Sequence, residues 1–140
     1  MRSYKDVFSE LNRAALIPFF VTGDPDYDTS LRVVKTAIDA GADILELGIP
    51  FSDPIADGST IQKADIRAQH AGMNVQKALD FIRQIKAYKD IPIGLLMYYN
   101  LVFLSGTIQA YLPVPGSRHQ PVAHLLALTA SPALPWLSQW

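Results

Sequence analysis

The chain has 140 residues, 49% of them hydrophobic and 18% charged, which is enough to bury the core of one soluble globular domain. A formal net charge of −1 argues against the basic surface that binding along a nucleic acid requires. Because the chain has no cysteine, it has no disulfide framework, thiolate nucleophile or zinc–sulfur site, a composition compatible with the cytoplasm.

Leu16 to Thr22 (LIPFFVT) forms the first apolar run and is closed by the turn sequence GDPD. A short run of this kind predicts a buried parallel strand followed by a loop. A helix is predicted behind it, capped by Asp28 or Thr29 and ended by Gly41. Its apolar residues recur at helical spacing and are Leu31, Val34, Ala37 and Ile38.

Strand and helix signals continue to alternate up to residue 104. Ile44 to Ile49 predicts a second strand, and the apolar residues between Ile61 and Ala71 predict a short helix. A stronger helix is predicted from Val75 to Ile85, and a third strand from Ile91 to Tyr99. This alternation predicts an α/β fold with a parallel sheet, either doubly wound or part of a (β/α)₈ barrel. Periodicity alone does not choose between the two.

The composition of the chain changes after Leu104. Residues 105–140 contain one charged side chain, Arg118, and five of the ten prolines. They show no helix cap, helical face or strand alternation, so we expect the domain to end near residue 104 and residues 105–140 not to continue it. The apolar stretch 122–137 is shorter than the ~20 residues of a membrane-spanning helix. The N-terminal MRSYKDVFSELN lacks the apolar centre of a secretory signal.

One acidic residue, Glu46, stands inside the predicted second strand, where an aliphatic side chain is expected. Because side chains alternate along a strand, Glu46 lies on the face opposite Leu45, Leu47 and Ile49. If that aliphatic face packs under the helices, Glu46 points to the inner face near the carboxyl end of the strand, where barrel enzymes carry their active sites. Burial in such a place raises the pKa of a carboxyl group, which suits proton transfer. The alternative is a strand-end glutamate paired with an arginine or lysine.

Asp53 and Asp57 lie in the loop sequence SDPIADG, where aspartate before proline or glycine is common turn chemistry. A structural role is therefore the default for both. His70, His119 and His124 have no metal-ligand spacing with acidic neighbours, so we expect no metal site.

The stretch ELGIPFSDPIADGSTIQ, residues 46–62, resembles the signature of the tryptophan synthase alpha chain family, whose members are (β/α)₈ TIM barrels. The flanking PFFVTGDPD, DAGADILELG and PIGLLMYYNLVF are similar to the first three strands and loops of the same family, in the same order. Ser59 stands where the family usually has proline. The resemblance covers residues 1–104 and implies the N-terminal portion of the barrel, about three βα units, as an incomplete barrel.

This resemblance implies a cytoplasmic lyase of tryptophan biosynthesis that cleaves indole-3-glycerol phosphate to indole and glyceraldehyde 3-phosphate by a retro-aldol reaction. Glu46 matches the acid/base residue of the family. Asp57 matches the carboxylate that accepts the indole N–H as positive charge grows on the ring nitrogen. Three residues match positions that line the indole pocket, with plain core packing as the alternative for each: Phe19, Leu96 and Tyr98.

A partner is also implied, because Pro50, Asp53 and Asn100 match positions that face the tryptophan synthase beta chain in an α₂β₂ tetramer. Pyridoxal phosphate belongs to that partner, and the alpha chain needs no cofactor. The phosphate site of the family is built from later loops that the resemblance does not reach, so we expect impaired turnover. A noncatalytic fragment that binds and modulates the beta chain is one alternative, and a different phosphosugar-binding barrel or small α/β module that only looks similar is another.

Two further expectations concern the integrity of the chain. Codons that can encode Leu112 to His119 read LARCREAG when two bases are restored after the first codon, which resembles the charged end of the third helix of the family. This predicts a two-base deletion near codon 112 or 113. Three strands without their barrel neighbours leave two sheet edges unpaired, so we expect a marginally stable, aggregation-prone chain.

Overall fold

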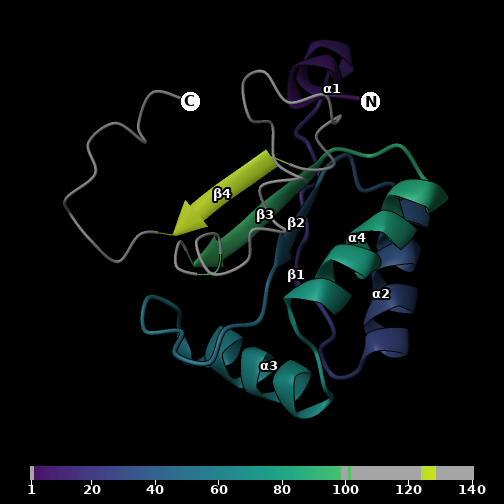
Figure 1. Cartoon of the computed structure of the whole chain (residues 1–140). Coiled ribbons are helices and arrows are strands. Elements are labelled where there is room, and N and C mark those ends of the chain that lie inside the picture. The colour runs from purple at the N-terminus through teal and green to yellow at the C-terminus, as the bar shows by residue number, and fades with distance from the viewer. Residues whose placement is uncertain (1, 99–100, 102–123, 129–140) are drawn as a thin grey trace, which may run out of the picture.

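The computed structural model describes residues 2–98, 101 and 124–128 (Figure 1). Its elements in chain order are α1 (Tyr4–Glu10), β1 (Phe19–Val21), α2 (Tyr27–Asp39), β2 (Leu45–Gly48), α3 (Ser59–His70), α4 (Val75–Tyr88), β3 (Ile93–Tyr98) and β4 (His124–Leu128). The three strands and three helices predicted before residue 104 are confirmed. Helix α1 was not predicted.

The four strands form one parallel sheet in the order β1-β2-β3-β4. Each strand is therefore paired with its neighbour in the chain, and the strand order has no reversal. A doubly wound sheet needs such a reversal at its switch point, whereas a barrel adds strands in sequence. The observed order thus favours the barrel over the doubly wound alternative.

Strand β4 corrects the expectation of only three strands. The sequence HLLAL, His124–Leu128, pairs in parallel with β3, from Gly94 opposite His124 to Tyr98 opposite Leu128. A short apolar run without polar alternation is typical of a parallel strand, but the prolines around this one obscured the signal. The proposed domain boundary near residue 104 stays a prediction.

The start of α2 also differs from the prediction. Asp26, not Asp28 or Thr29, is the N-cap, and its side chain accepts a hydrogen bond from the backbone N–H of Thr29 at 2.9 Å. That backbone hydrogen bond is the largest cause of the lowered pKa of Asp26. At the other end Gly41 has φ +100, as its predicted role in ending the helix requires.

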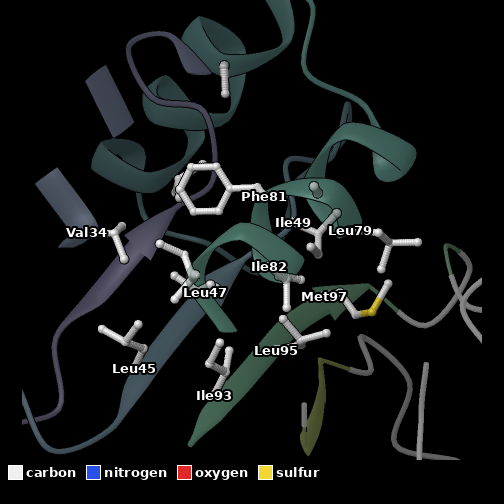
Figure 2. Close-up of a cluster of buried hydrophobic side chains, with 14 of the residues drawn as sticks. Val34, Leu45, Leu47, Ile49, Leu79, Phe81, Ile82, Ile93, Leu95 and Met97 are labelled. Carbon is white, nitrogen blue, oxygen red and sulfur yellow. The ribbon is translucent and has the colours of Figure 1, made fainter. Parts of the chain in front are cut away.

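Helices α2 and α4 pack side by side on one face of the sheet (Figure 1). Figure 2 shows the aliphatic side chains of β2 and β3 against these helices, including Leu47 and Leu95 against Phe81 and Ile82. Leu45, Leu47 and Ile49 all belong to this core, so the predicted alternation of β2 is confirmed. Each fully buried side chain of this size contributes about 1.5–3 kcal/mol to folding.

The loop between β1 and α2 is fixed against the neighbouring turn between α3 and α4. Gly23 has φ +81, and a Cβ there would lie 2.2 Å from Met73 Cγ, so only glycine fits. The next residue, Asp24, accepts two hydrogen bonds from the Arg67 guanidinium of α3, at 2.7 and 2.8 Å. These contacts position the carboxyl edge of β1 beside α3.

Helix α1 lies at the end of the sheet that is farther from α3 (Figure 1). A capping box between Ser3 and Asp6 begins it, and Val7 is fully buried. None of the helices within residues 2–98, 101 and 124–128 has the length and apolar character needed to cross a membrane.

Candidate active site

Glu46 lies on the face of the sheet opposite the helix-covered core. In the strand register it is level with Phe19 of β1 and Gly94 of β3, while Leu96 is level with Gly48. Residues level with one another on parallel strands share a face, so four predicted site residues lie on one face: Phe19, Glu46, Leu96 and Tyr98. Glu46 itself is half-buried.

Gly48 makes room on this face for an aromatic ring. A Cβ at Gly48 would lie 2.9 Å from Phe19 Cζ and 3.3 Å from Cε2, closer than side chains normally approach. Glycine two residues after Glu46 therefore allows the Phe19 ring to lie across the end of β2.

Asp57 is brought to the same face by Tyr98, at the end of β3. The Tyr98 hydroxyl donates to Asp57 Oδ2 at 2.8 Å and accepts from the backbone N–H of Ala56 at 3.0 Å. Burial, followed by the hydrogen bond to Asp57, raises the pKa of Tyr98 above its ordinary value of 10. Tyr98 is therefore a neutral hydrogen-bond donor to Asp57 at physiological pH.

Further contacts hold the loop that carries Asp57. The Gln62 amide of α3 donates to the carbonyl oxygens of Asp57, at 2.8 Å, and Pro54, at 3.2 Å. At the other end of the loop, the Phe51 ring stacks on Tyr98 with ring centroids 4.7 Å apart. The turn chemistry predicted for SDPIADG is present, since Asp57 N–H donates to Pro54 O at 3.1 Å.

The residues matched to partner-facing positions fall in different environments. Asp53 is exposed, whereas Pro50 is buried. Asn100 lies outside the described residues.

Four of the predicted site residues surround one small hollow at the carboxyl edge of the sheet. Phe19, Asp57, Leu96 and Tyr98 line it, and its volume of about 10 Å³ suits a single water molecule. Ligand pockets usually measure about 300 Å³ or more. Glu46 does not line the hollow but lies two residues before Gly48, which does.

Sequence reasoning missed Asp65, which lies on α3 and also lines the hollow. It is 4% exposed, and burial, with the nearby Asp57 charge as the second cause, raises its pKa to about 6. A signal was present, because Ile61, Asp65 and Ala68 recur at helical spacing and place a carboxyl group on the apolar face of the helix.

Tyr4 of α1 was also missed. Burial, followed by the charge of Glu46, raises the pKa of Tyr4, which places this residue near Glu46. Nothing in the local sequence could indicate it, since the approach depends on α1 folding across the end of the sheet. Within the described part of the chain, no three histidine or carboxylate side chains are placed to hold a metal ion.

Comparison with known proteins gives a consistent match. The family model described as tryptophan synthase alpha chain matches residues 6–112. The tryptophan synthase alpha chain of Methanothermobacter thermautotrophicus is 50% identical over 109 residues, covering 78% of this chain and 40% of that protein. That of Salmonella paratyphi B is 49% identical over 110 residues, covering 76% and 41%. This chain thus spans about 40% of the length of these relatives.

Solved structures give the same result. Tryptophan synthase subunit alpha from Legionella pneumophila has a TM-score of 0.69 at 31% identity, covering 76% of this chain and 41% of that one. Tryptophan synthase from M. tuberculosis has a TM-score of 0.70 at 32% identity, covering 77% and 44%. The sheet and helices are therefore the N-terminal portion of a (β/α)₈ barrel, and an unrelated phosphosugar-binding barrel is excluded. The chain belongs to the tryptophan synthase alpha chain family, a family of lyases in tryptophan biosynthesis.

Proposed function

We propose that this chain carries the two carboxylate residues, Glu46 and Asp57, of the site that cleaves indole-3-glycerol phosphate to indole and glyceraldehyde 3-phosphate. The observation that supports this most is the Asp57 carboxylate, held by the Tyr98 hydroxyl at 2.8 Å on the sheet face that carries Glu46. One face thus presents two carboxyl groups and a set of half-buried aromatic and aliphatic side chains.

Glu46 is the proposed proton-transfer residue. Cleavage breaks the carbon–carbon bond between the indole ring and the glycerol chain. The ring carbon gains a proton, and the glycerol hydroxyl loses one as its carbon becomes the aldehyde, so the step needs no oxidant or reductant. A half-buried carboxyl group near the carboxyl end of a strand suits both transfers.

Asp57 is the proposed electrostatic partner of the indole nitrogen. Positive charge grows on that nitrogen as the ring accepts its proton, and a fixed carboxylate that accepts the N–H stabilises the charge. A carboxylate has about four acceptor positions, and Tyr98 uses one on Oδ2. The contacts that Gln62 and Tyr98 make with the loop hold the remaining acceptor positions of the Asp57 carboxylate in place.

Turnover by the 140-residue polypeptide is proposed to be strongly impaired. A hollow of about 10 Å³ does not admit an indole ring without movement of Phe19, Leu96 or Tyr98. Binding energy from a remote phosphate also normally orients the reacting part of a substrate. We propose that neither this energy nor a full pocket is supplied by the described residues.

Indole release from indole-3-glycerol phosphate tests this proposal. We expect the purified chain to release indole at least about 10³-fold more slowly than a full-length relative. The remaining release is expected to disappear in Glu46→Gln and Asp57→Asn. Equal release by the parent and both variants, or release at the rate of the relative, contradicts the proposal.

A second candidate function is binding and modulation of the tryptophan synthase beta chain, the pyridoxal phosphate enzyme. The exposed tip of the Asp57 loop favours it, because Ile55 is 70% exposed although the loop is held at both ends. Beta-chain activity should change on addition of the chain, and the change should be lost in Ile55→Asp. An unchanged response with that variant rules this surface out.

A further inference from the structure

Asp57 is followed directly by glycine, and no other aspartate or asparagine of the sequence is. An aspartate in this position can react with its own chain, because the backbone nitrogen of the next residue lies within reach of the side-chain carboxyl group. Glycine favours that reaction, since it has no side chain to hinder the nitrogen and leaves the backbone free to turn. The bond between Asp57 and Gly58 is therefore the place where the chain can modify its own proposed site.

Gly58 is exposed, and its backbone is neither strained nor crowded. Its φ of −72 is one that any residue can adopt, and a Cβ added there would meet no atom within 4 Å. Among the described residues, none accepts a hydrogen bond from the Gly58 backbone N–H. The nitrogen is thus accessible for reaction, and the fold does not require glycine at this position.

Hydrogen bonds to its side chain, N–H and carbonyl hold Asp57 in a shape that opposes the reaction. Its Oδ2 accepts from the Tyr98 hydroxyl at 2.8 Å, and the same hydroxyl accepts from the Ala56 N–H at 3.0 Å. The carboxyl group is thus drawn toward the residue before Asp57, whereas the reactive nitrogen belongs to the residue after it. The Asp57 N–H donates to Pro54 O at 3.1 Å, and its carbonyl accepts from Gln62 at 2.8 Å, so the backbone is also held on both sides.

We propose that the Asp57–Gly58 bond is a site of spontaneous isoaspartate formation, and that the Tyr98 hydroxyl slows it in the folded chain. The Gly58 nitrogen attacks Cγ of Asp57 and loses its proton, and the carboxyl OH leaves with that proton as water, which closes a succinimide ring. Water then adds to one of the two ring carbonyls. Addition at Cγ restores aspartate, whereas addition at the former backbone carbonyl gives isoaspartate. Water is the only co-reactant.

Isoaspartate at position 57 removes the carboxylate that the proposed reaction uses. The main chain then runs through Cβ and Cγ, so it is longer by one methylene group. The free carboxylate is formed from the former backbone carbonyl, the group that Gln62 binds, and the Tyr98 hydroxyl loses its acceptor. This effect on catalysis rests on the proposed function of Asp57, but the formation of isoaspartate does not.

Peptide mapping of the full 140-residue chain tests the proposal without substrate. The chain would be kept at physiological pH and temperature, either folded or in urea. Isoaspartate would then be measured in each peptide by mass spectrometry with fragmentation that distinguishes it from aspartate. We expect it mainly at position 57, and at least about tenfold faster in urea, where the contacts of the loop are absent.

Three variants separate the reaction from the contacts that slow it. Gly58→Ala should slow the reaction at least about tenfold in urea, where the fold has no influence. Tyr98→Phe should speed it about fivefold or more in the folded chain and leave the rate in urea unchanged. Gly41→Ala, with a similar expected loss of stability far from the loop, is the matched control and should stay near the parent.

Three results would overturn the proposal: isoaspartate mainly at another aspartate or at none, an unchanged rate in Gly58→Ala, or equal rates in folded Tyr98→Phe and Gly41→Ala. The last result would mean that global unfolding, rather than release of the loop, controls the reaction. Failure of the fresh chain to release indole tells against the proposed function alone and leaves these rates as they are.

Discussion

On the helix-covered face of the sheet, Leu45, Leu47, Ile93, Leu95 and Met97 are each at most 2% exposed. The opposite face carries Phe19, Glu46 and Leu96, which are only half-buried, together with the Tyr98 hydroxyl and its carboxylate partner. Strand alternation separates the two sets residue by residue, so Glu46 and Leu47 are chain neighbours with different environments. The first face stabilises the fold, and the second is free to hold reactive groups.

Loss of a large side chain from the helix-covered face should have the largest effect. Phe81 is fully buried and lies edge-on to Tyr27 with ring centroids 5.5 Å apart. Phe81→Ala is expected to lower the free energy of unfolding by about 3–5 kcal/mol. That is a large part of the about 5–15 kcal/mol of a small domain, so the urea midpoint followed by far-ultraviolet circular dichroism should fall well below that of the parent. Ile66→Ala, at a 50% exposed position, is the control and should stay near the parent.

Gly23 gives a matched test of loop packing. Gly23→Ala combines a positive φ with a clash against Met73, and is expected to lower the unfolding free energy by about 2–4 kcal/mol in urea denaturation. Gly41→Ala has a similar φ but open space around its Cβ, so it should lose only about 1–2 kcal/mol. Met73→Ala should partly rescue Gly23→Ala. Equal losses at the two glycines would show that the Met73 contact has no effect.

Asp65 should make stability depend on pH. Its pKa is raised from an ordinary 3.8 to about 6, so folding favours the neutral form. The contribution of this group is complete below pH 3.8 and is lost as the pH rises through about 6. Asp65→Asn should therefore be about 2–3 kcal/mol more stable than the parent near pH 7.5 and about equal to it near pH 4. A gain that does not change with pH would indicate better packing instead.

The Tyr98 hydroxyl should have a smaller and more local effect. Tyr98→Phe removes one hydrogen bond to Asp57 and one from Ala56, and is expected to lower the unfolding free energy by about 1–2 kcal/mol. Amide hydrogen exchange at Ala56 should speed up before global unfolding does. Tyr88→Phe removes a hydroxyl that donates to exposed Asp39 and should change stability by under about 0.5 kcal/mol. Similar effects of the two variants would show that the Tyr98 hydroxyl stabilises the fold no more than an exposed hydroxyl does.

The smallest effect is expected at Glu46. Glu46→Gln should change the unfolding free energy by under about 0.5 kcal/mol, because its face is only partly covered. Leu47→Ala, one residue later on the other face, should lose about 2–5 kcal/mol. Urea denaturation of this pair measures the difference between the faces directly, and equal losses would contradict it.

The apolar pattern within single segments of the sequence was enough to predict most of the helices and strands. The apolar runs of β2 and β3 and the helical spacing of α4 were enough to place these elements, and alternation alone put Glu46 opposite Leu47. The cap of α2 was misplaced by two or three residues because three candidates, Asp26, Asp28 and Thr29, stand close together. Strand β4 was missed because the prolines around its apolar run obscured the local signal, and its pairing with β3 is what identifies it.

The candidate site likewise has residues that the sequence could name and contacts that it could not. Glu46 and Asp57 could be named from a motif, and Phe19, Leu96 and Tyr98 from strands beside it. The contact between Tyr98 and Asp57 joins residues 41 positions apart, and the burial of Asp65 depends on how α3 meets β1. Such contacts arise from tertiary packing, so no local window of the sequence contains them.

Mapping of indole onto the chain tests the central claim, that the face opposite the helices carries the site. Backbone and side-chain signals would be recorded as indole, the proposed product, is added to millimolar concentration. The account predicts that indole binds there by displacing Phe19, Leu96 or Tyr98, so the signals that shift belong to Phe19, Asp57, Leu96 and Tyr98. Shifts confined to the helix-covered side or to the exposed Leu16 and Ile17, or no shift at all, would contradict it.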